Sequence, residues 1–404
     1  MRKRYRYALG AAAARTGDEM SGPALLLTGM AVTGSASTGS TLLAAITIAA
    51  AVGGPLLGVL LDRTRRPGRL LAWALTLYAS ALVVIQLTLG HVPLTAAVLV
   101  AVGAGLLGPA LTGGWTAQLP RVVHPGELPR ATALDAMTFN LAGLTGPALA
   151  GLAGAHTGVI VSATLIVLAL PTTRMISTPH PPPAAHTPPA ARVAVGVRGV
   201  VGGCGAAVVE GFRAIVRGRV LLRATTTSVI SCAGQGMLMA SAPLLGARAF
   251  GSPDHGALLL SGIAASALVA NVALARRTRP IVPDTILWSS TLVLAVALLL
   301  AATVHPILVL VAAAVAGLAE GPQLTALFAV RHREAPEGLR GQIFITGASL
   351  KITGFALGAA VAGPIAVRSL PAALLTAAAV QLIAVLNYAW CTRRMSGTSA
   401  LASR

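Results

Sequence analysis

The stretch GVLLDRTRRPGR, residues 58–69, lies between two long apolar runs and holds four arginines and one acid. The whole chain of 404 residues is only 10% charged, so this short segment carries far more charge than its share. An apolar run of about 20 residues is long enough to cross the hydrocarbon core of a bilayer as a helix. We therefore interpret this stretch as a loop between two membrane-spanning helices.

The composition extends this interpretation to the whole chain. Apolar residues make up 55% of the sequence, and the mean hydropathy is +0.80. In a soluble domain roughly a quarter of the residues are charged. In this chain only 10% are charged. The alternating apolar and polar strands of about ten residues that form outer-membrane barrels are also absent. The sequence thus predicts an all-α protein with many membrane spans.

Twelve stretches are long and apolar enough to be predicted as spans. Their approximate limits are 7–32, 38–61, 70–89, 94–118, 131–154, 157–175, 221–246, 255–275, 285–303, 306–330, 340–366 and 370–391. The first, which contains charges, and the fifth, which is rich in glycine, give the weakest signals. The basic start resembles a signal peptide, but Arg15, Asp18 and Glu19 would interrupt its apolar core, so we expect a retained helix.

The basic residues indicate the orientation of the chain. They gather in alternate loops, and only Arg248 and Arg368 fall in the loops of the other side. Short arginine-rich loops resist translocation, so we expect both termini in the cytoplasm. The net charge of +19 is therefore spread over loops, and no nucleic-acid partner is expected. Arginine in place of lysine, with much alanine, glycine and proline, suggests a bacterial source and hence the plasma (inner) membrane.

A segment between the sixth and seventh spans divides the chain into two halves. It begins with STPHPPPAAHTPPAAR (177–192), which is too rich in proline to pack and is expected to be an extended spacer. Arginines beside Val, Phe and Ile then predict a short amphipathic helix on the inner membrane surface. The predicted domains are an N-terminal half, a linker, a C-terminal half and a tail, over 1–175, 176–220, 221–391 and 392–404.

The two halves show traces of an internal repeat. GPALTGGWTAQLP (108–120) aligns with GPQLTALFAVRHR (321–333). AMTFNLAGLTGPALAG (136–151) aligns with GASLKITGFALGAAVA (347–362), which sets Asn140 opposite Lys351. Two duplicated halves are typical of transporters, whose substrate path runs between them at the middle of the membrane.

The opening stretch resembles a signature of the major facilitator superfamily, Gly-x-x-x-Asp-Arg-x-Gly-Arg-Arg between the second and third helices. Four positions match, namely Gly58, Asp62, Arg63 and Arg66, whereas Arg65 stands in place of the central glycine. A degenerate copy, LARRTRP, follows the eighth span at 274–280. The resemblance covers nearly the whole chain and implies a bundle of twelve helices in two pseudo-symmetric halves, with no catalytic activity.

The resemblance also implies a gate. Asp62 is expected to meet the positively polarised N-terminal end of a helix in the other half. The eleventh span begins near Gly341, beside Arg340, and would suit this contact. Such a contact would hold the cytoplasmic side closed. The alternative is that the charges of this loop serve only to orient the chain.

A second stretch, AGLTGPALAG (142–151), resembles the Gly-Pro motif of the superfamily's drug:proton antiporters through Gly146, Pro147 and Gly151. The match is loose, because Ala150 stands where the family has glycine. Close helix packing by small residues is the alternative. Many of these antiporters carry an arginine in the fourth span, which has no charge here, so any coupling charge must lie elsewhere.

Few ionisable groups lie inside the predicted spans, and each costs about 2.5–3.5 kcal/mol there, so the presence of each needs a reason. The candidates for transport or proton coupling, with two neighbouring amides, are Arg15, Asp18, Glu19, Asn140, Glu320, Gln323 and Lys351. The resemblance places the first and tenth spans around the central cavity, with the eleventh beside them. Asp135 is expected at the surface or at the gate.

Two interpretations of these charges stay open. In one, Arg15 with Asp18 or Glu19, one helical turn apart, and Glu320 with Lys351 are structural ion pairs. In the other, one acid carries protons, because an apolar cavity favours the protonated form of a carboxyl group. A carboxylate would also suit a cationic, amphiphilic substrate.

The sequence therefore predicts a monomeric secondary transporter that works by alternating access, with proton-coupled efflux of a small hydrophobic or cationic compound as its first candidate function. An uptake or facilitative transporter for a metabolite is the alternative. A membrane enzyme would need a cluster of acids or histidines, and an ATP-driven pump would need a GxxxxGK[ST] loop. The histidines and the three cysteines lack ligand spacing, so no cofactor or metal is expected.

Overall fold

The computed structural model describes residues 2–34, 36–177, 208–252, 254–277 and 282–402, and these ranges are almost entirely helical. The long helices are α1 (Arg2–Thr33), α2 (Ala36–Arg63), α3 (Pro67–Thr88), α4 (Leu94–Pro109), α6 (Leu128–Thr173), α8 (Arg219–Phe250), α9 (Asp254–Arg276), α10 (Pro283–Ala301), α11 (Pro306–Glu334), α12 (Arg340–Arg368) and α13 (Leu370–Ala402). The proline-rich part of the linker lies outside the described residues.

Short elements join some of these helices. A π-helix, η1 (Ala110–Gly114), and a short helix, α5 (Trp115–Ala117), extend α4. The remaining short turns are the 3₁₀ segments η2 (Leu119–Arg121), η3 (Pro125–Glu127), η4 (Arg174–Ser177) and η5 (Glu337–Leu339). Residues 208–217 form the helix that the linker sequence predicted.

Ten helical segments are long and apolar enough to cross a membrane, and each coincides with a predicted span. The other two predicted spans are helical too, in α1 and in the first part of α6. Their mean hydropathy is lower than that of the other ten segments. Arg15, Asp18 and Glu19 lower it in α1, and Asp135 and Asn140 lower it at the start of α6. A count of twelve membrane spans therefore stays a prediction.

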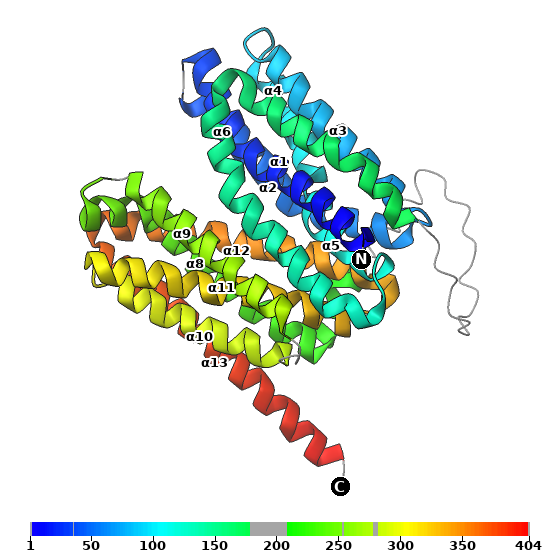
Figure 1. Cartoon of the computed structure of the whole chain (residues 1–404), viewed down its shortest axis with the longest axis vertical. Helices are drawn as coiled ribbons and strands as arrows, with labels where there is room; N and C mark the ends of the chain where they lie inside the picture. The colour runs from blue at the N-terminus through cyan, green and yellow to red at the C-terminus, as the bar shows by residue number, and fades with distance from the viewer. Residues whose placement is uncertain (1, 35, 178–207, 253, 278–281, 403–404) are drawn as a thin grey trace.

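The fifth and sixth predicted spans join without a loop. They form the single element α6, whose backbone leaves the helical conformation at Gly154, where φ is +73°. Left-handed backbone of this kind favours glycine. Figure 1 shows α6 turning back on itself at one end of the molecule.

The helices form two bundles, α1 to α6 and α8 to α13 (Figure 1). Each has its own apolar core, built mainly of Leu, Ile, Val and Ala side chains. The bundles contact each other chiefly through α2 with α12 and through α6 with α9. Glycines permit the close approach of α2, since a Cβ atom at Gly58 would lie 2.7 Å from the Cα atom of Gln342.

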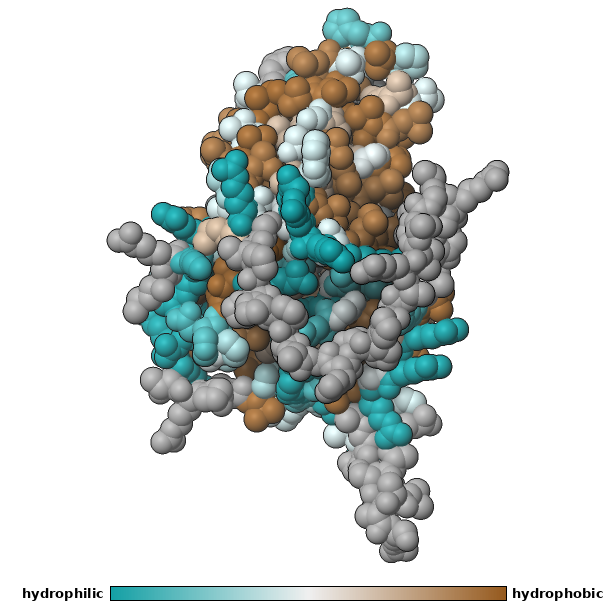
Figure 2. Space-filling model, turned by 90° about the vertical axis from the view of Figure 1, so that its right-hand side faces the viewer, coloured by the Kyte–Doolittle hydropathy of each residue, from teal (hydrophilic) through white to brown (hydrophobic). Residues whose placement is uncertain are grey.

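The surface agrees with a membrane environment. Large apolar side chains project from the helices, among them Leu99, Leu152 and Val367, which are 71%, 85% and 75% exposed. Figure 2 views the side on which α1 begins and shows hydrophilic side chains gathered on this face, below an apolar region. This is the distribution expected when lipid covers the helices and water reaches only their ends.

Candidate functional site

A cavity of about 280 Å³ lies between the two halves. Helices α1, α2, α3, α4 and η1 form most of its wall, and α12 contributes Ala348, Ser349 and Ile352 from the other half. Two neighbouring acids of α1, Asp18 and Glu19, line it. Among the described residues of this wall there is no basic side chain. The cavity is therefore suited to a positively charged or proton-exchanging ligand.

Asp18 is held by a hydroxyl group from another helix. The Tyr78 hydroxyl of α3 donates to Asp18 Oδ1 over 2.8 Å. The same hydroxyl lies 2.9 Å from Ser21 Oγ, which donates to the backbone carbonyl of Asp18 over 2.7 Å. Tyr78 is 1% exposed, so its position is fixed by packing. The carboxyl group of Asp18 thus has a set direction at the cavity wall.

Glu19 faces a different neighbour. A Cβ atom at Gly146 of α6 would lie 2.7 Å from the Cβ atom of Glu19 and 3.0 Å from its carbonyl carbon. The glycine of the predicted Gly-Pro motif therefore lets α6 pack directly against α1 beside this acid. The Glu19 side chain is exposed to the cavity, and no described residue forms an ion pair with it.

The prediction of an ion pair between Arg15 and Asp18 or Glu19 is wrong. Arg15 Nη1 lies 2.9 Å from Asp135 Oδ1, and the two side chains are 1% and 0% exposed. Of the two positions expected for Asp135, the surface is wrong, because α6 begins at Leu128 and Asp135 lies two turns inside the helix, buried against Arg15. A place at the gate stays a prediction. A buried charge needs an opposite charge and further hydrogen-bond partners, and Asp135 supplies the opposite charge for Arg15, whose Nε alone finds no partner among the described residues.

Hydroxyl and carbonyl groups complete the surroundings of this pair. Thr116 Oγ1 accepts from Arg15 Nη2 over 2.8 Å and donates to Asp135 Oδ2 over 2.8 Å. Arg15 also donates to the Thr138 hydroxyl and, over 3.4 Å, to the Thr112 carbonyl in the π-helix η1. π-helical turns inside α-helices often occur at functional sites. Here the turn joins the cavity wall to the buried ion pair.

The candidates of the second half are arranged differently. Gln323 is 5% exposed, and its amide donates to Thr291 over 2.8 Å and to Ser231 over 3.0 Å. Gln235 donates to the Gln323 carbonyl oxygen over 3.1 Å. Gln323 therefore belongs to a neutral network within this half and does not line the cavity.

Glu320 and Lys351 do not form the expected ion pair in the described part of the chain. The Asn140 side-chain nitrogen is buried and finds no hydrogen-bond partner among the described residues. The structure thus brings Asp18 and Glu19 into the cavity and leaves these three residues outside its wall.

The contact expected for Asp62 is present. The N–H groups of Gly341 and Gln342, at the start of α12, donate to Asp62 Oδ1 and Oδ2 over 2.7 and 2.8 Å. Arg63 and Arg66 of the same motif are exposed around this contact. A carboxylate at a helix N-terminus complements the partial positive charge of the helix.

Aromatic side chains close the same end further inside. Phe139 of α6 lies against Phe328 of α11, with ring centroids 5.5 Å apart, and Phe328 lies 5.8 Å from Phe344 of α12. The Arg15 guanidinium carbon lies 3.7 Å from the centroid of the Phe139 ring. The buried ion pair is therefore in direct contact with the aromatic layer between the halves.

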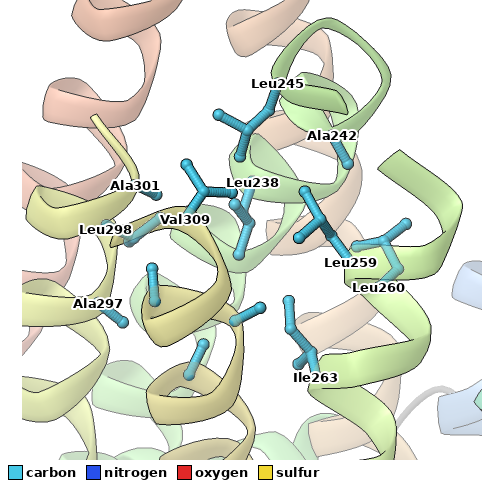
Figure 3. Close-up of a pocket in the computed structure, with 13 residues that line it drawn as sticks. Leu238, Ala242, Leu245, Leu259, Leu260, Ile263, Ala297, Leu298, Ala301 and Val309 are labelled. Carbon is cyan, nitrogen blue, oxygen red and sulfur yellow. The ribbon is translucent and has the colours of Figure 1, made fainter. Parts of the chain in front are cut away.

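A second cavity lies wholly within the C-terminal half. Figure 3 shows Leu238, Leu259, Leu298 and Val309 pointing into it. Its volume is about 20 Å³ and its lining is entirely Leu, Ile, Val and Ala. Such a space admits no more than about one water molecule and offers it no polar partner. We interpret it as a packing void.

Four polar partners were not identified from the sequence, namely Tyr78, Ser21, Thr116 and Thr138. Tyr78 carried a usable signal, since it is a hydroxyl-bearing side chain in the middle of the apolar stretch LTLYASALVV (75–84). The threonines carried none, because hydroxyls that bond to their own helix are common in membrane spans.

Two helical halves around a shared cavity define a membrane transporter. The chain belongs to the Major Facilitator Superfamily, whose family model matches residues 7–363. No curated protein matches it by sequence. Solved transporters share the fold.

The human organic anion transporter MFSD10 (TETRAN) is 17% identical with a TM-score of 0.75, and the alignment covers 95% of this chain and 99% of that one. A bacterial homologue of the iron transporter ferroportin, in the outward-facing state, is 15% identical with a TM-score of 0.74, with 97% and 100% covered. The proton:xylose symporter XylE bound to 6-bromo-6-deoxy-D-glucose is 12% identical with a TM-score of 0.65, with 95% and 94% covered.

Proposed function

We propose that this protein exports a small hydrophobic or cationic compound in exchange for protons, by alternating access across a bacterial plasma membrane with both termini in the cytoplasm. The observation that carries the proposal is the pair of acids, Asp18 and Glu19, in a cavity between the halves whose described wall holds no base.

The cavity chemistry supports a cationic amphiphile. Apolar side chains such as Leu43, Ile46 and Ile352 share the wall with the two acids. A carboxylate in such surroundings is stabilised either by a proton or by a cation. Proton and substrate would therefore compete for the same oxygens, and this competition couples their movements in opposite directions.

The gate supports alternating access. Asp62 holds the start of α12, and the aromatic layer lies between this contact and the cavity. In our proposal this is the cytoplasmic gate in its closed form. Opening the gate breaks two hydrogen bonds to a charged acceptor, so the closed form is favoured without ligand. Ligand binding would then offset the cost of breaking these bonds.

The test uses inverted membrane vesicles with an acidic lumen and a pH-sensitive dye. We expect a transported compound to trigger loss of the proton gradient in wild type. This loss should vanish in Asp18→Asn and fall at least about tenfold in Glu19→Gln, because the neutral side chains cannot exchange a proton. Glu320→Gln is the matched control, since Glu320 is an acid of the second half outside the cavity wall.

Either of two results would contradict the proposal. One is the absence of any response to a broad panel of compounds from protein that is folded and inserted. The other is a response that persists in the Asp18→Asn and Glu19→Gln variants. A facilitative or uptake transporter would then be the better description.

A further inference from the structure

The helix of residues 208–217 is continuous with the first membrane helix of the C-terminal half. The Gly218 N–H donates to the Ala214 carbonyl over 3.0 Å, and the Leu222 N–H donates to the Gly218 carbonyl over 2.7 Å. Gly218, with φ −75° and ψ 94°, makes the bend after which α8 starts at Arg219. The helix is therefore held at the level where α8 enters the membrane.

The inner face of this linker helix rests on the start of α12. Ile215 is 2% exposed and packs with Ala335 and Ile343. Gly211 is buried, and a Cβ atom there would lie 2.9 Å from the Cβ atom of Gln342. The helix thus approaches Gln342 as closely as a glycine permits.

Gln342 is also part of the gate. Its backbone N–H donates to Asp62, and its Cα atom faces Gly58 of α2. The residue is enclosed by α2 on one side and by the linker helix on the other. The linker helix and the start of α12 belong to the same half, so they leave Asp62 together when the gate opens.

The outer face of the same helix has no partner among the described residues. Val209, Phe212 and Val216 are 46%, 50% and 44% exposed, and their spacing of three and four residues places them in one stripe. Arg213 and Arg217, both exposed, follow one position later and form a parallel stripe with the exposed Glu210, which leaves this stripe with a net positive charge. An apolar stripe beside a basic one is the pattern of a helix lying in a membrane surface.

We propose that this outer face binds anionic lipid headgroups of the inner leaflet and thereby stabilises the closed form of the gate at Asp62. The apolar stripe enters the acyl boundary and the two arginines meet lipid phosphates. Because the helix moves with α12, opening of the gate would shift its outer face away from its position at the membrane surface, so lipid binds the closed form better than the open form. A ligand shifts an equilibrium only through such a difference. The effect on the gate rests on the gating part of the proposed function, whereas lipid binding does not.

The experiment uses the full chain in liposomes of phosphatidylcholine with or without phosphatidylglycerol. In a background with Cys204, Cys232 and Cys391 replaced by serine, an environment-sensitive dye at Val209→Cys reports contact with quencher-bearing phosphatidylglycerol. Spin labels at Arg65→Cys and Gly338→Cys, two exposed loop positions on opposite halves, report the distance across the gate. The test variant is Arg213→Gln/Arg217→Gln, and Arg276→Gln/Arg277→Gln at the exposed end of α9 removes the same charge elsewhere.

We expect phosphatidylglycerol to quench the dye and to raise the ratio of closed to open forms about tenfold in wild type and in the α9 variant, since two arginines near an anionic surface supply that much. In Arg213→Gln/Arg217→Gln both responses should fall to the level of pure phosphatidylcholine. An equal response in this variant, or no quenching in wild type, would overturn the proposal. Quenching without any change in distance would overturn the coupling to the gate. Neither readout involves a substrate or a proton gradient, so failure of proton-coupled export would be seen separately.

Discussion

The two halves of the molecule stabilise buried polar groups in different ways. The N-terminal half encloses a full ion pair, Arg15 with Asp135, and presents two further acids to the cavity. The C-terminal half also buries charged side chains, Arg331 and Arg223, which are 1% and 7% exposed, but beside them lies a neutral network of Ser, Thr and Gln side chains centred on Gln323. The acids that line the cavity thus belong to the N-terminal half alone.

This difference suggests a division of labour. A buried ion pair is costly and contributes little net stability, so its presence calls for another reason. Arg15 contacts both the π-helix beside the cavity and the aromatic layer between the halves. We infer that the first half carries the acids of the cavity, while the second supplies the helix end that Asp62 holds.

The largest expected effect separates these two kinds of interior. Asp135→Ala leaves the Arg15 charge buried without its partner and should destabilise the protein by about 3–5 kcal/mol. Gln323→Ala, in the neutral network, should cost only about 1–3 kcal/mol. Unfolding in mild detergent, followed by circular dichroism with denaturant, measures both.

A double variant sharpens this test. Arg15→Met/Asp135→Leu removes the whole pair and leaves no lone charge, so it should recover most of the stability lost in Asp135→Ala. Equal losses in the single and double variants would mean that packing, and not charge, makes this site sensitive.

The second prediction concerns the gate. The motif of the N-terminal half contains an acid, Asp62, and its degenerate copy in the C-terminal half does not. Asp62→Asn weakens two hydrogen bonds to the start of α12, and bonds to a charged group are worth about 1.5–3 kcal/mol. The ratio of open to closed forms should therefore rise about tenfold or more. The spin-label distance across the gate measures this ratio. The degenerate copy after α9 has basic residues but no acid, so Arg276→Gln should change the ratio by less than about twofold.

The smallest expected effect compares two glycines that the internal repeat sets opposite each other. A Cβ atom at Gly354 of α12 would lie 2.7 Å from the Val229 carbonyl oxygen of α8, whereas one at Gly143 of α6 would meet nothing within 4 Å. Gly354→Ala should cost about 1 kcal/mol or slightly more from overpacking. Gly143→Ala should be neutral or gain up to about 1 kcal/mol in helix propensity. Thermal unfolding of the two variants side by side decides this, and equal shifts would show that the halves pack alike here.

The contact of Asp62 could be predicted because its motif is local in sequence and its partner is a helix start, which glycine and arginine mark near Gly341. The partner of Arg15 could not be predicted. Sequence reasoning favours neighbours three and four residues away, and it overlooked Asp135, which lies 120 residues later. Only the packing of α1 against α6 decides between these partners.

The long helices themselves could be predicted from apolar length, and in the described part of the chain ten helical segments have the length and apolarity of a membrane span. Their irregularities could not. The π-helix after Pro109 and the absence of a loop at Gly154 depend on how neighbouring helices fit, and neither has a distinct composition. Of the site, the two acids were identified, but the role of Tyr78 in holding one of them depends on the position of α3.

The turn at Gly154 has a mechanical consequence. Only one residue between the two arms of α6 departs from helical geometry, so the arms have no slack and cannot slide lengthwise past each other. One arm carries Asp135 and Phe139 at the interface, and the other packs on the back of α1 through Ser162, which donates to the Gly17 carbonyl over 2.6 Å. The hairpin therefore links the aromatic layer directly to the far side of α1, and a shift of one arm along its axis would draw the other arm with it.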